Sequence, residues 1–167
     1  MTNEDSLIPA EARRAIGEQR TIELGEISLR DLQRYAVAAQ DDSPRYFDVQ
    51  VAGETAYRGL IAPPNMLTAM IGWEVGPDES ALRADGLPQS TERRPPLRVK
   101  RVMGAGQELE FRNPVRPGDR FTRTDKVVEM TQREGRTGPM VITVTEQTYR
   151  NQSGEIAVIC RSTSIAR

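Results

Sequence analysis

Residues 40–48, QDDSPRYFD, gather three carboxylates, a hydroxyl and a phenol between a helical pattern and a glycine- and proline-rich loop. Such a stretch could hold an acid and a base around one bound water, as general acid–base catalysis requires. Histidine is the usual base because its pKa lies near neutral pH, but the chain contains no histidine. A site here would work with a carboxylate and a phenol, or with a base from a companion chain.

A second stretch, GLIAPP at residues 59–64, comes directly before a segment with helical spacing. Proline suits the first turn of a helix, and the N–H groups of that turn have no partner inside the helix. The helix dipole also favours negative charge at this end. The stretch is either a site for a developing negative charge or simply a helix start preceded by a glycine turn.

The remaining candidates for chemistry are few. One local basic cluster could bind CoA phosphates or an acidic carrier protein, or it could simply belong to a solvated loop. It comprises Arg93, Arg94, Arg98, Lys100 and Arg101. With one cysteine, no histidine and no carboxylate motif, the sequence predicts no metal site and no serine nucleophile with a histidine base.

The bulk composition limits the partners and the compartment. The 167 residues suffice for one ordinary domain, and the net charge of −1 gives no basic field for nucleic acid. The opening residues contain acids and no apolar core typical of a signal peptide, and no apolar run is long enough to span a membrane. Since Cys160 is the single cysteine, we expect a soluble protein of the cytoplasm.

The periodicities predict an α+β order of elements. We expect an N-terminal arm over residues 1–20 and one domain over residues 21–167, with an amphipathic helix at 29–40 and a buried helix from 63 to about 73. A polar connection follows at 75–97, and period-two segments begin at 108, 121, 140 and 156. A buried helix needs a cover, and a curved antiparallel sheet rolled around it, the hot-dog fold, provides one.

Three stretches carry a family resemblance: ISLRDLQRYAVAAQDDSPRYFD, AYRGLIAPPNML and ELEFRNPVRPGDRF. They resemble the MaoC-like dehydratase and (R)-specific enoyl-thioester hydratase family, in particular its N-terminal-type dehydratase domain, from about residue 16 onward. The resemblance implies a hot-dog fold and reversible hydration of an enoyl-CoA or enoyl-carrier-protein thioester. It implies no cofactor beyond that thioester substrate.

The resemblance also implies the site residues. The catalytic signature of the family has an Asp, then Asn-Pro two and three residues later, and a His five residues after the Asp. With Pro44 as the anchor, Asp41 takes the Asp place, Ser43 the Asn place and Tyr46 the His place, although Asp42 remains an alternative to Asp41. The predicted catalytic residues are therefore Asp41 and Tyr46.

Each of these two residues also has a purely structural interpretation. A tyrosine has a pKa near 10, which burial raises further, so Tyr46 is expected to position a water or a carbonyl, or only to fill the space of a lost imidazole. The structural interpretation of Asp41 is a loop acid that accepts backbone hydrogen bonds after the helix.

Substrate binding is expected at the helix start, where the related enzymes hold the thioester carbonyl, and at the basic cluster. The predicted substrate-binding residues are Gly59, Ile61, Ala62, Pro63, Asn65, Met66, Arg98 and Lys100.

The missing histidine favours one function over two others. The favoured function is a hydratase or dehydratase subunit that contributes scaffold and acyl-binding surface to a heteromer with a catalytic hot-dog chain. The alternatives are a self-sufficient homodimeric hydratase that uses Asp41, and a non-enzymatic acyl-thioester-binding protein. Because a lone hot-dog sheet has open edges, we expect a homodimer or heteromer in every case.

Overall fold

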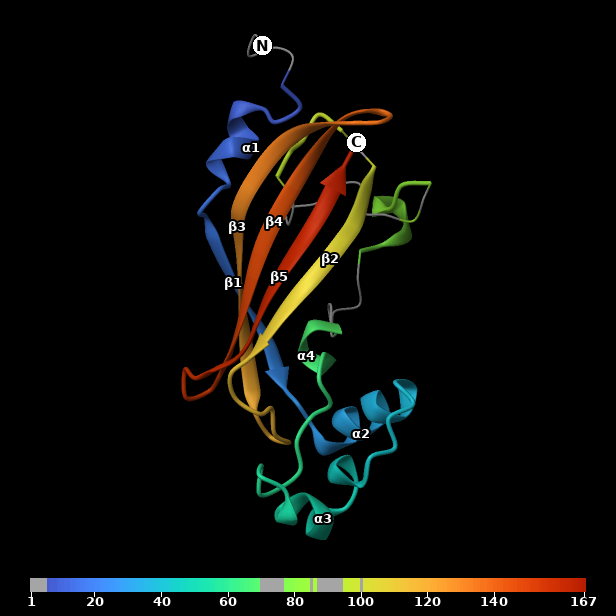
Figure 1. Ribbon diagram of the computed structural model, residues 1–167, viewed down its shortest axis with the longest axis vertical. Helices are drawn as coiled ribbons and strands as arrows, with labels where there is room; N and C mark the ends of the chain where they lie inside the picture. The colour runs from blue at the N-terminus through green and yellow to red at the C-terminus, as the bar shows by residue number, and fades with distance from the viewer. Residues whose placement is uncertain (1–5, 70–76, 85, 87–94, 100) are drawn as a thin grey trace.

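The computed structural model describes residues 6–69, 77–84, 86, 95–99 and 101–167, and the elements follow one another along the chain (Figure 1). They are α1 (Ala10–Arg14), β1 (Gln19–Glu26), α2 (Leu29–Ala38), the 3₁₀ turn η1 (Pro44–Tyr46), α3 (Val49–Glu54), α4 (Met66–Ala69), the 3₁₀ turn η2 (Glu79–Ala81), β2 (Val102–Phe111), β3 (Arg120–Gly135), β4 (Gly138–Asn151) and β5 (Ile156–Ala166).

The five strands form one antiparallel sheet in the order β1-β3-β4-β5-β2. The predicted meander is present in β3, β4 and β5, but β2 lies beside β5 and β1 beside β3, so the sheet ends in two strands that sequence order would not place there. The strand expected from residue 108 to 115 runs instead from Val102 to Phe111. It stops there because Pro114 has no N–H to donate to a ladder and the Asn113 side chain donates to the Ile156 carbonyl at 2.8 Å.

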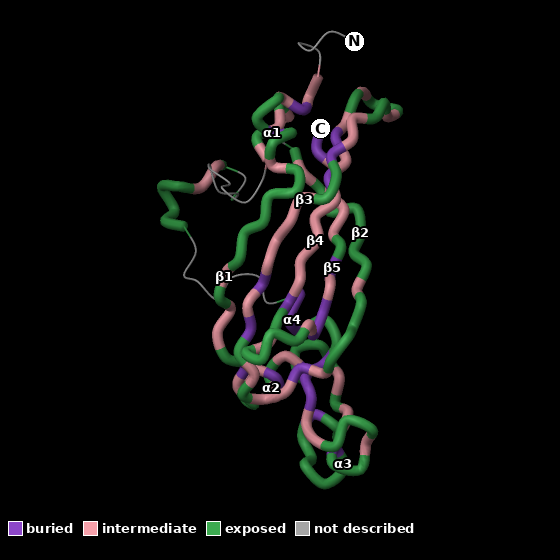
Figure 2. The backbone as a smooth tube through the Cα atoms, turned by 90° about the vertical axis from the view of Figure 1, so that its left-hand side faces the viewer, coloured by how far each residue is buried: buried purple, intermediate pink, exposed green. Residues whose placement is uncertain are grey.

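Buried side chains form two clusters along the sheet (Figure 2). The larger cluster joins α2 and α4 to the sheet and contains Leu32, Met66, Leu67, Phe121 and Tyr149 among others. The smaller cluster joins the N-terminal segment to the far end of the sheet, and it contains Ile8, Ala12, Met130, Val141 and Ala166. The N-terminal arm is therefore packed on the sheet, and its last two residues, Gln19 and Arg20, already belong to β1.

The helix predicted at 29–40 is confirmed as α2, and its ends have clear causes. Ser28 and Asp31 form a reciprocal capping box, in which the Asp31 N–H donates to the Ser28 hydroxyl at 3.1 Å. The helix stops at Ala38 because Gln40 adopts the left-handed conformation (φ 56°), which lets the Asp41 N–H donate back to the Ala36 carbonyl at 2.9 Å.

The buried helix predicted from residue 63 is described only as α4, Met66–Ala69, whose Met66 and Leu67 are buried as expected. Its predicted continuation through residues 70–73 lies outside the described residues, as do residues 75–76, 85 and 87–94 of the connection at 75–97. Within the described ranges, no helix has the length and apolar character of a membrane span.

Candidate functional site

The turn after α2 brings Asp41 and Tyr46 together. The Asp41 carboxylate accepts a hydrogen bond from the Ser43 N–H at 3.3 Å, which bends the chain into η1. Within η1 the Phe47 N–H donates to the Pro44 carbonyl at 3.0 Å, and this turn carries Tyr46 into the larger core cluster. The Tyr46 hydroxyl is there hydrogen-bonded to the Asp41 carboxylate.

The surroundings of Tyr46 keep its phenol protonated. Burial raises the pKa of the Tyr46 hydroxyl above its ordinary value of 10, and the hydrogen bond to the Asp41 carboxylate raises it further. The guanidinium of Arg45, which lies 5.2 Å from the ring centre, acts in the opposite direction but does not reverse the rise in pKa. Near neutral pH Tyr46 is therefore a hydrogen-bond donor and not a base.

The GLIAPP loop lies beside this turn because the NPVRPGD segment holds it there. The Ala62 N–H donates to the Val115 carbonyl at 2.7 Å, and the Arg116 guanidinium donates to the Tyr57 carbonyl at 2.5 Å. Asp119 fixes Arg116 in turn, because its carboxylate accepts the Arg116 N–H at 2.8 Å. This arrangement fixes the loop against the end of the sheet.

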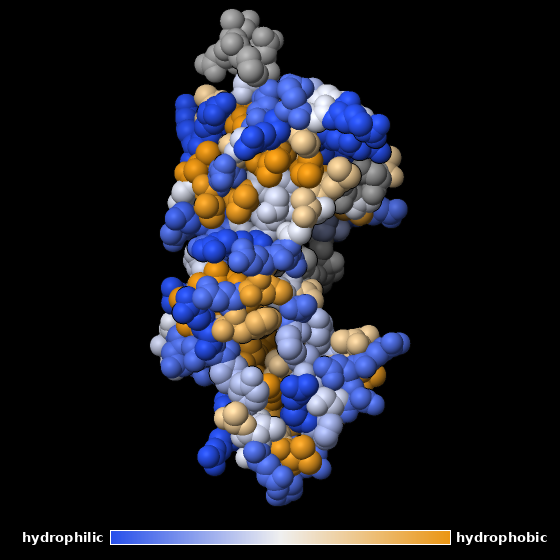
Figure 3. Space-filling model, in the orientation of Figure 1, coloured by the Kyte–Doolittle hydropathy of each residue, from blue (hydrophilic) through white to orange (hydrophobic). Residues whose placement is uncertain are grey.

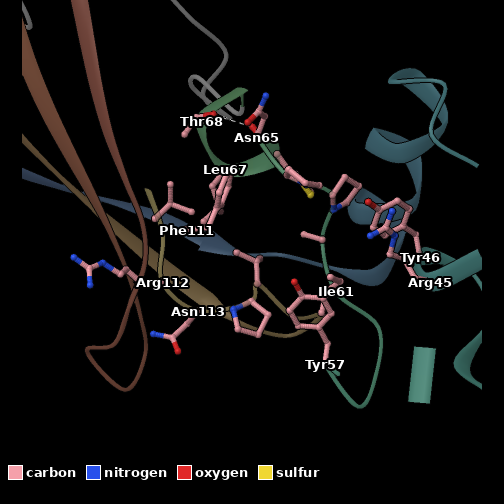
Figure 4. A pocket seen from close by; sticks show the side chains of 17 residues that line it. Arg45, Tyr46, Tyr57, Ile61, Asn65, Leu67, Thr68, Phe111, Arg112 and Asn113 are labelled. Atoms are coloured by element: carbon pink, nitrogen blue, oxygen red, sulfur yellow. Dashed lines mark hydrogen bonds between the residues drawn. The ribbon is translucent and has the colours of Figure 1, made fainter. Parts of the chain in front are cut away.

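Asn65 connects the loop to α4 in an unusual backbone conformation. Its φ of 66° lies in the left-handed region, which asparagine tolerates better than most residues. Its carbonyl accepts from the Ala69 N–H at 2.9 Å and from the Thr68 hydroxyl at 3.0 Å (Figure 4).

A cavity of about 280 Å³ lies between the two loops and the end of the sheet. Tyr46 and Tyr57 enter it from the α2–α3 side, and residues 111–113 enter from the sheet side (Figure 4). The lining residues are Arg45, Tyr46, Tyr57, Ile61, Ala62, Pro63, Pro64, Asn65, Met66, Leu67, Thr68, Phe111, Arg112, Asn113, Pro114, Val115 and Val158. A mainly apolar lining with a few polar groups is typical of sites for small organic ligands.

Most of the predicted site residues meet at this cavity. Tyr46, Ile61, Ala62, Pro63, Asn65 and Met66 line it. Asp41 lies behind Tyr46, to which it is hydrogen-bonded.

Gly59 and Arg98 do not line the cavity, and neither does Asp41. Gly59 ends the turn after α3, where its N–H donates to the Ala52 carbonyl at 3.0 Å. Arg98 lies at the far end of the sheet, where its N–H donates to the Leu7 carbonyl at 3.1 Å. Lys100 lies outside the described residues, as do Arg93 and Arg94.

Sequence reasoning missed several lining residues, in particular those that enter the cavity from the sheet. Tyr57, Thr68 and the segment from Phe111 to Val115 were not among the predicted site residues. The NPVRPGD motif was the available signal, since it contains Asn113, Pro114 and Val115. Across the part of the chain that the structure describes, no group of three or more side chains is arranged to hold a metal ion.

Comparisons with known proteins assign the family. The model of the FAS1-like dehydratase domain region matches residues 14–160. Mesaconyl-C(4)-CoA hydratase of Chloroflexus aurantiacus is 36% identical over 75 residues, which are 44% of this chain and 27% of the hydratase. The chain therefore spans about a quarter of the length of that relative.

Two solved structures have a similar fold. A MaoC-like dehydratase from Rhodospirillum rubrum has a TM-score of 0.63 at 21% identity, with 90% of this chain and 91% of that chain covered. The ChsH1–ChsH2 complex from Mycobacterium tuberculosis has a TM-score of 0.70 at 13% identity, with 93% and 86% covered. The fold is thus the predicted α+β hot-dog, and the chain belongs to the family of MaoC-like hot-dog dehydratases.

Proposed function

We propose that this chain is a subunit of an acyl-thioester hydratase or dehydratase that works beside a second hot-dog subunit carrying the catalytic histidine. The observation that carries the proposal is Tyr46. When the chain is aligned to the family signature through Pro44, Tyr46 takes the position of the histidine, and burial and Asp41 raise the pKa of its phenol. A group that stays protonated cannot take the proton from a water that attacks the double bond.

The proposed role of the chain is to bind the acyl thioester. The apolar part of the cavity would take the carbons next to the thioester, and Tyr46 would donate a hydrogen bond to a water or a carbonyl oxygen. Asp41 would hold the Tyr46 hydroxyl in place through the bond that joins the two side chains. Substrate orientation of this kind contributes to rate even without a reacting group.

Uncovered apolar surface supports an assembly with another hot-dog chain. The edge strand β2 exposes Met103 (45%) and Phe111 (53%), and the α2–α3 region exposes Val37 (67%) and Val49 (64%). Figure 3 shows apolar side chains gathered over the strands in two zones and again at the end of the molecule formed by α2 and α3. Apolar patches on an open sheet edge are typical of surfaces that a partner covers. One similar structure, ChsH1–ChsH2, is itself a complex.

Complementation tests the proposal. The purified chain is titrated into a hot-dog subunit with the complete Asp-x-Asn-Pro-x-His signature, encoded by a neighbouring gene, and hydration of a short enoyl-CoA is followed. We expect activity to rise with added chain and to level off at one chain per catalytic subunit. An Asp41→Asn chain should still complement, because the reacting pair belongs to the partner.

Two other results would replace the proposal. Hydration by the chain alone, abolished in Asp41→Asn, would make it a self-sufficient hydratase; the hydrogen bond between Asp41 and Tyr46 is the feature that favours this second candidate. Tight binding of the thioester without turnover in either preparation would make it a binding protein.

A further inference from the structure

Two arginines line the cavity, and they differ in whether they have an anion. Arg112 is paired with Glu110, whose Oε1 lies 2.6 Å from its Nη2, and its guanidinium points away from the other side chains of the cavity (Figure 4). Arg45 makes no ion pair with any carboxylate among the residues that the structure describes. Of these two cations, Arg45 is therefore the one whose charge is available to a ligand.

Two contacts hold the Arg45 guanidinium at the rim of the cavity, although the residue is exposed to solvent. Its Nε donates to the Ser43 hydroxyl at 3.0 Å, and the Ser43 N–H is in turn tied to the Asp41 carboxylate at 3.3 Å. The guanidinium carbon lies 5.2 Å from the centre of the Tyr46 ring, as in a cation–π contact. These contacts leave the two Nη groups without a hydrogen-bond partner in the described ranges.

The donors at this rim suit an anion with two oxygen atoms. The two Nη groups of one guanidinium form a planar pair that matches a carboxylate or a phosphate. The Tyr57 hydroxyl points into the same cavity (Figure 4) and has no hydrogen bond within the part of the chain that the structure describes. The wall between them is apolar and includes Ile61 and Ala62. The rim therefore suits an anionic group that is attached to a carbon chain.

The position of Arg45 distinguishes between the two anions that an acyl thioester can carry. In the proposed function the reacting carbons lie at Tyr46, and Arg45 lies against the ring of that residue. The phosphates of CoA or of a carrier protein are separated from the thioester sulfur by the whole pantetheine arm, so they lie well away from the reacting carbons. A carboxylate on the acyl group can lie beside them. The cavity of about 280 Å³ is small for an organic ligand, which favours a short acyl group.

We propose that Arg45 binds a carboxylate carried by the acyl group and so makes the protein selective for thioesters of short dicarboxylic acids. This inference rests on the proposed function, since it takes the cavity as the binding site of the thioester end. The two Nη groups of Arg45 donate to the carboxylate oxygens, and the Tyr57 hydroxyl supplies a further donor from the cavity wall.

Calorimetric binding of two matched ligands tests the inference without any need for turnover. Glutaryl-CoA and pentanoyl-CoA have acyl chains of equal length, and only the glutaryl chain ends in a carboxylate. Each is titrated into the full chain alone and into its mixture with the catalytic subunit, with free CoA as the third ligand. We expect glutaryl-CoA to bind roughly 3- to 10-fold more tightly than pentanoyl-CoA, as a paired contact between an exposed guanidinium and a carboxylate predicts.

Variants of the two arginines identify the residue that is responsible. Arg45→Gln should remove the preference for glutaryl-CoA, and Arg45→Lys, which keeps the charge but not the planar pair of donors, should retain part of it. Arg112→Gln is the matched control, because it removes from the same cavity a cation that already has its anion. This control should keep the full preference.

The other outcomes separate the inference from the proposed function. Equal binding of the two thioesters to the unaltered chain, or a preference that survives in Arg45→Gln, overturns the inference while the proposed function stands. If Arg45→Gln weakens both thioesters and free CoA by the same factor, Arg45 binds a phosphate, and the inference is again overturned. If neither thioester binds in either preparation, the proposed function fails and the inference fails with it.

Discussion

At the scale of single residues, the chemistry depends on what replaces the imidazole. On the proposed alignment Tyr46 takes the place of the family's histidine, but it cannot act as a base near neutral pH because burial and the Asp41 carboxylate raise its pKa. On the same alignment the chain keeps the Asp of the family signature but lacks its Asn and its His. Restoring these two residues is therefore a direct test of the alignment.

Restoring the signature should create activity in the lone chain. In Ser43→Asn/Tyr46→His an imidazole would lie beside Asp41 with a pKa near neutral pH, so we expect enoyl-CoA hydration at least about 10-fold above that of the unaltered chain. Tyr57→His is the control, since it places an imidazole on the same cavity away from Asp41. A repaired chain as inactive as the control would show that more than the imidazole is missing.

Tyr149 should make the folded state sensitive to alkali. Burial raises its pKa from 10 to about 12, so the protonated form is favoured in the folded state. Its contribution to stability is complete below pH 10 and is lost as the pH rises through 12. We expect the urea midpoint to fall between pH 10 and 12, and Tyr149→Phe to remove much of that slope. An equal slope in Tyr149→Phe and Tyr35→Phe would contradict the assignment.

The buried ion pair should be costly to break from one side. Asp125→Ala leaves Arg123, which is 4% exposed, without its anion, so we expect a loss of about 3 kcal/mol in the free energy of unfolding. Glu146→Ala is the comparison, because the Glu146–Arg161 pair is far more exposed (28% and 51% of the two side chains) and should be worth less than about 1 kcal/mol. Equal losses for the two variants in urea titrations would argue against the buried pair.

At the scale of elements, local sequence signals predicted where helices and strands lie, but long-range pairing determined which of their faces are buried. Ser28 and Asp31 predicted the start of α2 because a capping box is a contact between residues three apart. The period of two predicted β4, but it did not say which face would be covered. Thr143 and Thr145 lie on the face of α4, while the more apolar Ile142 and Val144 lie on the other face. Alternation of residue types predicts a strand, but which of its two faces is buried depends on the elements that pack against it.

The cap of α2 should also matter for the site, because the turn that follows α2 leads directly to Asp41. Ser28→Ala removes the acceptor of the Asp31 N–H, which lies 3.1 Å away, and should lower the free energy of unfolding by about 1 kcal/mol. Ser153→Ala is a fitting control, since Ser153 is exposed in a turn and contributes only its backbone N–H to a bond with Asn151. Equal denaturation midpoints for the two variants would speak against the capping box.

At the scale of the whole molecule, the sequence predicted the hot-dog class but not how the site is enclosed. The cavity needs residues 111–115, which reach it because β2 pairs with β5 at the sheet edge. No local pattern encodes that pairing, so Phe111 and Arg112 were not predicted to line the site. The GLIAPP residues were predicted because their motif is contiguous in the sequence. Arg98 belonged to the predicted basic cluster, yet its segment lies at the opposite end of the sheet.

The open edge of β2 should mediate assembly. A lysine at Met103, which is 45% exposed on the edge strand, should weaken association with another hot-dog chain because a buried charge opposes edge contact. Val128→Lys is matched in exposure (43%) but lies on β3, inside the sheet. Solution scattering at micromolar concentration should give a smaller particle mass for Met103→Lys but not for Val128→Lys. Identical masses for the two variants would indicate that the interface lies elsewhere.

The central claim is that this chain alone does not hydrate enoyl thioesters, and the turnover number of the homogeneous chain tests it most directly. With saturating short enoyl-CoA at neutral pH, we predict a rate indistinguishable from that of the Asp41→Asn variant. Turnover near 1 s⁻¹ or faster, within the ordinary range of enzymes, that disappears in Asp41→Asn would contradict the account.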